Sequence, residues 1–165
     1  MDAGQESALW NAALRSREEQ EREPVFSLLG EPRYSLGIET IYEGYLLHYG
    51  RPRLFAPEDQ DAALLLGDYL YAHGLVRIEK VGSVEAVSDL AELIALCAYL
   101  RAEEIVGDGP VWAATAAALG RGELESGRSS LRLDNDPNPL ERLARTRTGD
   151  AAVDSALATH HGRLR

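Results

Sequence analysis

The chain has 165 residues, of which 45% are hydrophobic, and it carries a formal net charge of −10. A chain of this length suits one domain with a substantial core. Its acidic surface repels phosphate backbones, which disfavours nucleic-acid binding as the main function. No apolar run reaches the ~20 residues of a membrane-spanning helix, and the acidic N-terminus lacks a signal-peptide core. We therefore expect a cytoplasmic protein.

Ala and Leu dominate the hydrophobic residues, while Val and Ile are sparse and aromatic residues make up 7%. This mixture favours helix over sheet. We expect an all-α protein in which residues 1–120 form a helical bundle and residues 121–165 form a polar, partly disordered tail with weak helices. The single cysteine, Cys97, lies in an apolar run and is predicted to be a small core residue.

The first predicted helix covers residues 5–20, with Ser7 as its cap. The stretch Ile38–Leu75 is more informative, because it contains two helices of different character joined by a Gly-Arg-Pro-Arg turn at residues 50–53. In the first of these helices, apolar residues recur at the spacing of one helix face. They are Ile38, Ile41, Tyr42, Tyr45, Leu46 and Tyr49.

The second helix of this stretch is predicted to begin at Pro57, because proline is favourable in the first position of a helix. From Ala62 to Leu75 it is apolar nearly all round, which is typical of a buried helix. Asp68 lies inside that run, so its carboxylate needs either a partner or access to water.

Three further elements follow the central stretch. Ser83 is the predicted cap of a long helix that extends to about Glu104, and an Ala-rich helix covers residues 111–119. In the tail, Asn138 and Glu141 have the spacing of a capping box, and a second weak helix covers residues 150–160. The adjacent His160 and His161 are interpreted as solvated residues of this tail.

The common metal and phosphate motifs, such as Cys-x-x-Cys, His-Glu-x-x-His and a Gly-rich loop, are absent. Two pairs of carboxylates stand four residues apart, Glu39 with Glu43 and Glu85 with Asp89. Such pairs point the same way on a helix and can share a divalent cation. Most such pairs are merely solvated helix surface, so both interpretations stay open.

The turn Gly50-Arg51-Pro52 is followed by the sequence Leu-Leu-Leu-Gly-Asp-Tyr-Leu-Tyr-Ala at residues 64–72. This combination resembles the polyprenyl synthetase family, the all-helical trans-isoprenyl diphosphate synthases. In that family a Gly-(Arg/Lys)-Pro-like turn precedes a buried helix marked by Leu-x-Gly-Asp-Tyr. The resemblance covers residues 36 to about 104. It implies a bundle like part of the isoprenoid synthase fold, with Gly67, Asp68 and Tyr69 as its structural motif.

The same resemblance aligns the family's first Asp-rich motif with residues 39–43. Glu39 and Glu43 stand where metal-binding aspartates would be, so they are the implied ligands of Mg²⁺. Arg51 and Arg53 remain near the position of the family's basic residues and are the implied contacts to diphosphate. The second Asp-rich motif has no counterpart.

Three functions are compatible with these observations. The first, which we rank ahead, is a non-catalytic subunit that packs its apolar helices against a helical partner, either a catalytic prenyl diphosphate synthase subunit or a second copy. The second is a magnesium-dependent binder of prenyl diphosphates, or a prenyltransferase, using Glu39 and Glu43. The third is an unrelated helical interaction module. Because the metal-binding motifs are incomplete, we expect the isolated chain not to elongate farnesyl diphosphate with isopentenyl diphosphate.

Overall fold

The structure is a computed structural model that describes residues 7–165. In this part of the chain the regular elements are all helical, as the composition predicts. They are α1 (Ala8–Ala13), α2 (Ser35–Tyr49), α3 (Gln60–Glu79), α4 (Val84–Ala102), α5 (Asp108–Ala118), α6 (Glu125–Asp134), α7 (Asn138–Thr148) and α8 (Asp150–Arg163), with single 3-10 turns η2 (Ser27–Leu29) and η3 (Pro32–Tyr34). No helix within residues 7–165 is long and apolar enough to cross a membrane.

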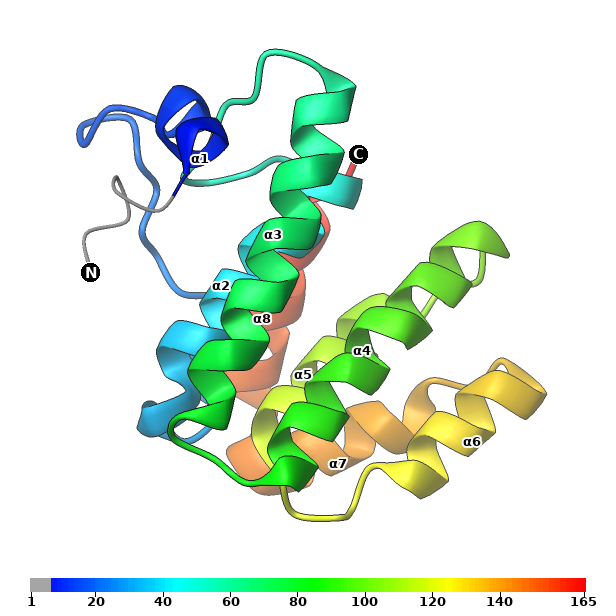
Figure 1. Cartoon of the computed structure of the whole chain (residues 1–165). Helices are drawn as coiled ribbons and strands as arrows, with labels where there is room; N and C mark the ends of the chain where they lie inside the picture. Colours follow the sequence, from blue (N-terminus) through cyan, green and yellow to red (C-terminus); the bar gives the residue numbers. More distant parts are fainter. Residues whose placement is uncertain (1–6) are drawn as a thin grey trace.

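The helices pack around one main core in which α2 and α5 are central. Figure 1 shows α2 and α3 side by side, with α8 behind α2. In this view α4 and α5 lie to the right of α3, and α6 and α7 lie at the lower right. The core contains side chains from all helices except α1. Its largest fully buried members are Trp112, Tyr34, Tyr42, Tyr45 and Phe26. Cys97 also lies in this core, as predicted, and burial raises the pKa of its thiol.

Glycines bring the antiparallel helices α2 and α3 into close contact. Gly44 of α2 faces Gly67 of α3, and Gly37 faces Gly74 one heptad away on each helix. A β-carbon added to Gly44 would lie 2.9 Å from the carbonyl oxygen of Gly67. The glycine of the Leu-Gly-Asp-Tyr sequence is therefore a contact point between two backbones.

The helix starts follow capping side chains. The Ser7 and Ser83 hydroxyls accept hydrogen bonds from the backbone N–H groups of Trp10 (3.0 Å) and Ala86 (3.3 Å), as predicted. The predicted start at Pro57 is wrong. The cap of α3 is Asp59, whose carboxylate accepts from the N–H of Ala62 at 2.8 Å and so determines a later first turn.

The first helix is shorter than predicted, since α1 ends at Ala13 rather than at residue 20. Residues 5 and 6 of that prediction lie outside the described residues. After α1 the chain runs alongside the turn between α2 and α3. The N–H of Arg15 donates to the carbonyl of Leu54 (2.9 Å), and the N–H of Glu21 donates to the carbonyl of Arg53 (3.1 Å). These hydrogen bonds between distant segments replace the helical ones.

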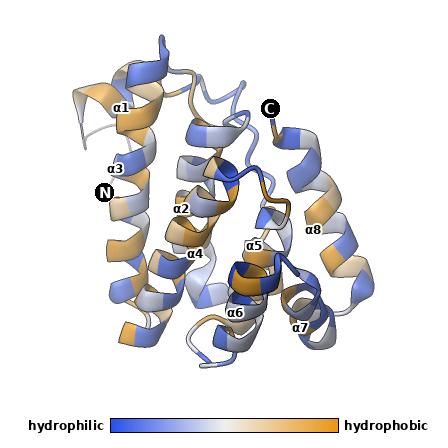
Figure 2. Cartoon of the chain, turned by 90° about the vertical axis from the view of Figure 1, so that its right-hand side faces the viewer, coloured by the Kyte–Doolittle hydropathy of each residue, from blue (hydrophilic) through white to orange (hydrophobic). Residues whose placement is uncertain are grey.

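The prediction that α3 is buried all round is also wrong. One face packs on α2, but Leu65 and Val76 on the other face are 63% and 51% exposed, and Figure 2 shows hydrophobic segments along this helix. The side chain of Asp68 is 72% exposed and lies 3.1 Å from the Nε2 atom of His48. Its carboxylate therefore has both a partner and access to water.

Residues 121–165 form three helices instead of a partly disordered tail. Leu131 of α6, Leu140 of α7 and Val153 of α8 are buried in the main core. The expected capping box at Asn138 and Glu141 is not formed, because α7 begins at Asn138 itself and has no side-chain cap. This region contains few apolar residues, so its composition is typical of a disordered tail. A few apolar residues at helical spacing are nevertheless enough to dock each helix on the core.

Candidate functional site

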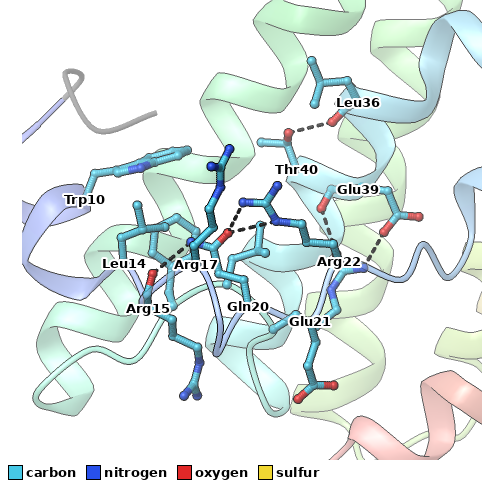
Figure 3. Close-up of a pocket in the computed structure, with 13 residues that line it drawn as sticks. Trp10, Leu14, Arg15, Arg17, Gln20, Glu21, Arg22, Leu36, Glu39 and Thr40 are labelled. Carbon is cyan, nitrogen blue, oxygen red and sulfur yellow. Dashed lines mark hydrogen bonds and ion pairs between the residues drawn. The ribbon is translucent and has the colours of Figure 1, made fainter. Parts of the chain in front are cut away.

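A cavity lies between the segment that follows α1, the start of α2 and the turn at residues 53–55. Its volume is about 670 Å³. Figure 3 shows the side chains around it. The lining residues are Trp10, Leu14, Arg15, Arg17, Gln20, Glu21, Arg22, Leu36, Glu39, Thr40, Arg53, Leu54 and Phe55. We call this cavity the arginine pocket.

One wall of the arginine pocket is apolar. Trp10 packs edge-on against Phe55, with ring centroids 4.9 Å apart, and Leu14 and Leu54 pack against the same small hydrophobic cluster. Leu36, at the start of α2, adds an exposed apolar side chain. This wall offers an indole and aliphatic groups to the hydrocarbon part of a ligand.

The other wall carries arginines that form no ion pair with the residues that the structure describes. Among the ion pairs of residues 7–165, none includes Arg15, Arg17 or Arg22; the guanidinium of Arg22 donates only to the neutral side chain of Gln20, at 2.6 and 3.1 Å. Acidic residues outnumber basic ones by 27 to 17 in this protein. The lining of this cavity contains four arginines and two glutamates, so its charge is positive where that of the whole protein is negative, which favours an anionic ligand.

The floor of the pocket is a buried ion-pair network centred on Arg53. This guanidinium donates to Glu39 (2.7 Å) and to Glu43 (3.1 Å). The Glu43 carboxylate also accepts from the backbone N–H groups of Arg53 and Leu54, at 2.8 and 2.7 Å. Burial alone would lower the pKa of Arg53, but the charges of Glu39 and Glu43 raise it, so the guanidinium stays charged.

This network bears directly on the magnesium site that the resemblance implies. Glu43 and Arg53 are 1% and 3% exposed, and the other oxygen of Glu39 accepts from the N–H groups of Val25 and Ser27. The two carboxylates face a guanidinium and backbone donors, so they do not fit a Mg²⁺ ion in this arrangement. Within the described chain, no group of three or more His, Cys, Asp or Glu side chains is placed to hold a metal ion.

The remaining residues of the implied site have separate positions. Arg53 is too enclosed to clamp a diphosphate, whereas Arg51 is exposed and its guanidinium donates to the carbonyl of Gly162 at the end of α8. Gly67 lies in the contact with α2, and Tyr69 packs edge-on against Trp10 with ring centroids 5.9 Å apart. The structure thus brings Arg53 together with Glu39 and Glu43 and places Arg51, Gly67 and Tyr69 elsewhere.

A second polar cluster, inside the core, was missed at the sequence level. The hydroxyl of Tyr42 and the Nδ1 atom of His160 are 2.9 Å apart, and the Nε2 atom of His160 lies 3.6 Å from Asp108. Tyr45 and Arg101 also donate to Asp108. His160 is therefore a buried residue and not a solvated one. No sequence signal identified it, because its partners lie on α2 and α5, far away in the chain.

Fold and site together define a class: an all-α protein with a pocket that is apolar on one side and cationic on the other. A scan against protein-family models, a search of curated proteins and a search of solved structures each returned no match to this chain.

Proposed function

We propose that this protein binds a small organic anion with an apolar portion in the arginine pocket, without transforming it. The observation that carries this proposal is the placement of Arg17 and Arg22, neither of which belongs to an ion pair within the described residues, opposite the wall that contains Trp10 and Leu14. Guanidinium groups bind carboxylates and phosphates through paired, charge-assisted hydrogen bonds. The apolar wall would remove the hydrocarbon part of the ligand from water.

Prenyl diphosphates belong to this ligand class, and they are the ligands that the resemblance to polyprenyl synthetases implies. Binding without turnover agrees with the engagement of Glu39 and Glu43 by Arg53, because the chemistry of that family depends on carboxylate-bound magnesium. Under this proposal the chain would retain a binding role of the family and lack its reaction.

Isothermal titration calorimetry of the full chain with decanoate and with geranyl diphosphate tests the proposal. We expect saturable binding of at least one probe, and an affinity about a hundredfold lower or more in the double variant Arg17→Gln/Arg22→Gln, since each of the two lost charge-assisted hydrogen bonds contributes about 1.5–3 kcal/mol. Arg142→Gln is the matched control, because Arg142 is an exposed arginine on α7 away from the pocket. No binding of either probe, or equal losses in the control, would rule the proposal out.

The exposed apolar face of α3 supports a second candidate function, that of a subunit bound to a helical protein partner. Leu64, Leu65 and Val76 present hydrocarbon to solvent on a helix whose other face is packed on α2. Exposed apolar groups gathered on one element are typical of protein contacts. Co-purification from the native host tests it: recovery of a prenyl diphosphate synthase subunit with wild type, and its loss in Leu65→Glu/Val76→Glu, is the expected result. Recovery of no synthase subunit contradicts it.

A further inference from the structure

A second hollow adjoins the arginine pocket. Its volume is about 460 Å³, and it is lined by Arg15, Glu21, Arg51, Pro52, Ala158, Thr159, Gly162 and Arg163. Arg15 and Glu21 line both cavities. Figure 3 shows their side chains pointing away from those of Arg17 and Arg22. The two cavities are therefore neighbours that share one arginine and one glutamate.

The second hollow lies where the C-terminal end of the chain is hydrogen-bonded to the turn after α2. The N–H of Arg51 donates to the carbonyl of Arg163 at 2.8 Å, and Gly50 and Leu164 form an isolated antiparallel bridge. The arginines at residues 15, 51 and 163 come from three distant segments and converge on a space whose lining is more polar than apolar. Such a site suits the charged end of a ligand rather than its hydrocarbon.

An internal carboxylate already lies in this hollow. Glu21 accepts from the guanidinium of Arg163 at 2.5 Å, and this pair, together with the charges of Arg15 and Arg51, lowers the pKa of Glu21. The side chain of Glu21 is 64% exposed, so it can leave this position at small cost. The hollow thus already binds one carboxylate, and that carboxylate is replaceable.

We infer that the two cavities together take a ligand with two anionic groups joined by an apolar chain. One group binds Arg17 and Arg22, the chain lies against Trp10 and Leu14, and the second group replaces Glu21 beside Arg51 and Arg163. This inference rests on the proposed function, because it assumes that the arginine pocket binds an anion. It adds that a dianion is preferred to a monoanion of the same length.

Calorimetry with matched pairs of probes tests this inference: octanoate against suberate and decanoate against sebacate, with octyl phosphate to distinguish phosphate from carboxylate recognition. We expect the better diacid to bind about tenfold more tightly than its monoacid, as for one added charge-assisted contact. Arg51→Gln should remove this advantage and leave monoacid binding unchanged. Glu21→Gln should strengthen diacid binding several-fold, because the competing carboxylate is gone.

The outcomes separate the two proposals. If no monoacid, alkyl phosphate or diacid binds and geranyl diphosphate does not bind either, the proposed function is wrong and the dianion inference is wrong with it. If monoacids bind but neither diacid gains affinity, or if Arg51→Gln weakens both kinds of ligand equally, only the dianion inference is wrong. Circular dichroism of each variant checks that the helices are intact, and Arg142→Gln again serves as the control for lost positive charge.

Discussion

Arg53 and Glu43 are buried against each other, with the Nε atom of Arg53 3.1 Å from the Glu43 carboxylate and both side chains closed off from solvent. Together with Glu39 they connect the turn after α2 to the middle of that helix. Two glutamates that have the spacing of a metal-binding pair are thus the partners of one arginine.

Loss of one member of this network should destabilise the fold. We expect Glu43→Gln to lower the free energy of unfolding by about 3 kcal/mol, because it leaves part of the charge of Arg53 buried without a counter-ion. Urea denaturation followed by circular dichroism measures this. Glu85→Gln, at the exposed member of the other carboxylate pair, is the control and should change the denaturation midpoint much less, because the hydrogen bonds that lower the pKa of Glu85 are exposed to solvent. A midpoint for Glu43→Gln equal to wild type would show that the network does not stabilise the protein.

The glycine contact between α2 and α3 should not tolerate a side chain. Gly44→Val is expected to cost about 2 kcal/mol or more, because its β-carbon meets the rigid backbone oxygen of Gly67 and forces the helices apart. Ala72→Val introduces the same side chain on the exposed face of α3 and should have little effect. Thermal unfolding of both variants tests the pair, and equal melting temperatures would contradict close backbone packing at this crossing.

Asp68 is expected to tolerate reversal of its charge. Its carboxylate is mostly exposed, and the contact with His48 is its single ion pair within the described residues, so Asp68→Lys should change the melting temperature only slightly. Asp89→Lys provides the contrast. Asp89 is buried and accepts from Arg128 (3.1 Å) and from the N–H of Gly120 (2.8 Å), so that variant should unfold far more easily. A large loss for Asp68→Lys would show that the exposed position of Asp68 is wrong.

Acid should weaken the core through Asp108. Burial alone would raise the pKa of this carboxyl group, but hydrogen bonds from His160 and Tyr45 and the charge of Arg101 hold it well below its usual range. A folded-state pKa below the unfolded one contributes stability that is present above the unfolded value, about 4, and is lost as the pH falls towards the folded value. We therefore expect stability to fall below about pH 4, and less steeply in Asp108→Asn.

Denaturant midpoints measured at a series of pH values test this expectation. Asp134→Asn, at an exposed carboxylate of α6, is the control and should follow the wild-type curve. If the Asp108→Asn curve were parallel to that of wild type throughout the acid range, the carboxylate would not be the cause of the acid sensitivity.

The local sequence pattern was enough to predict the central helices. The stripe that begins at Ile38 predicts α2, Ser83 marks the start of α4, and the apolar run around Cys97 predicts a core position. These features depend on contacts within one or two turns of helix, which the sequence contains directly. The extent of α1 could not be predicted in the same way, because its end depends on hydrogen bonds to the distant turn at residues 53–56.

The candidate site likewise combines features that the sequence shows with features that only the tertiary structure decides. The identity of Glu39 and Glu43 as a pair on one helix face is visible in the sequence, but their partner is Arg53, on a turn that only the tertiary structure brings to them. Arg15 and Arg17 fall within the helix predicted for residues 5–20 and Arg22 lies just beyond it, and they line a cavity only because the helix ends at Ala13. His160 was assigned to a solvated tail, and its burial depends on α8 docking beside α2.

The sequence by itself therefore determined the all-α class, most helix positions and the acidic character of the protein, because these follow from composition and short-range periodicity. The tertiary structure decided which charges are paired and which arginines are left to face a cavity. The physical reason is that the energy of a charge depends on the burial and on the neighbours it acquires across the fold, and neither is encoded within one segment.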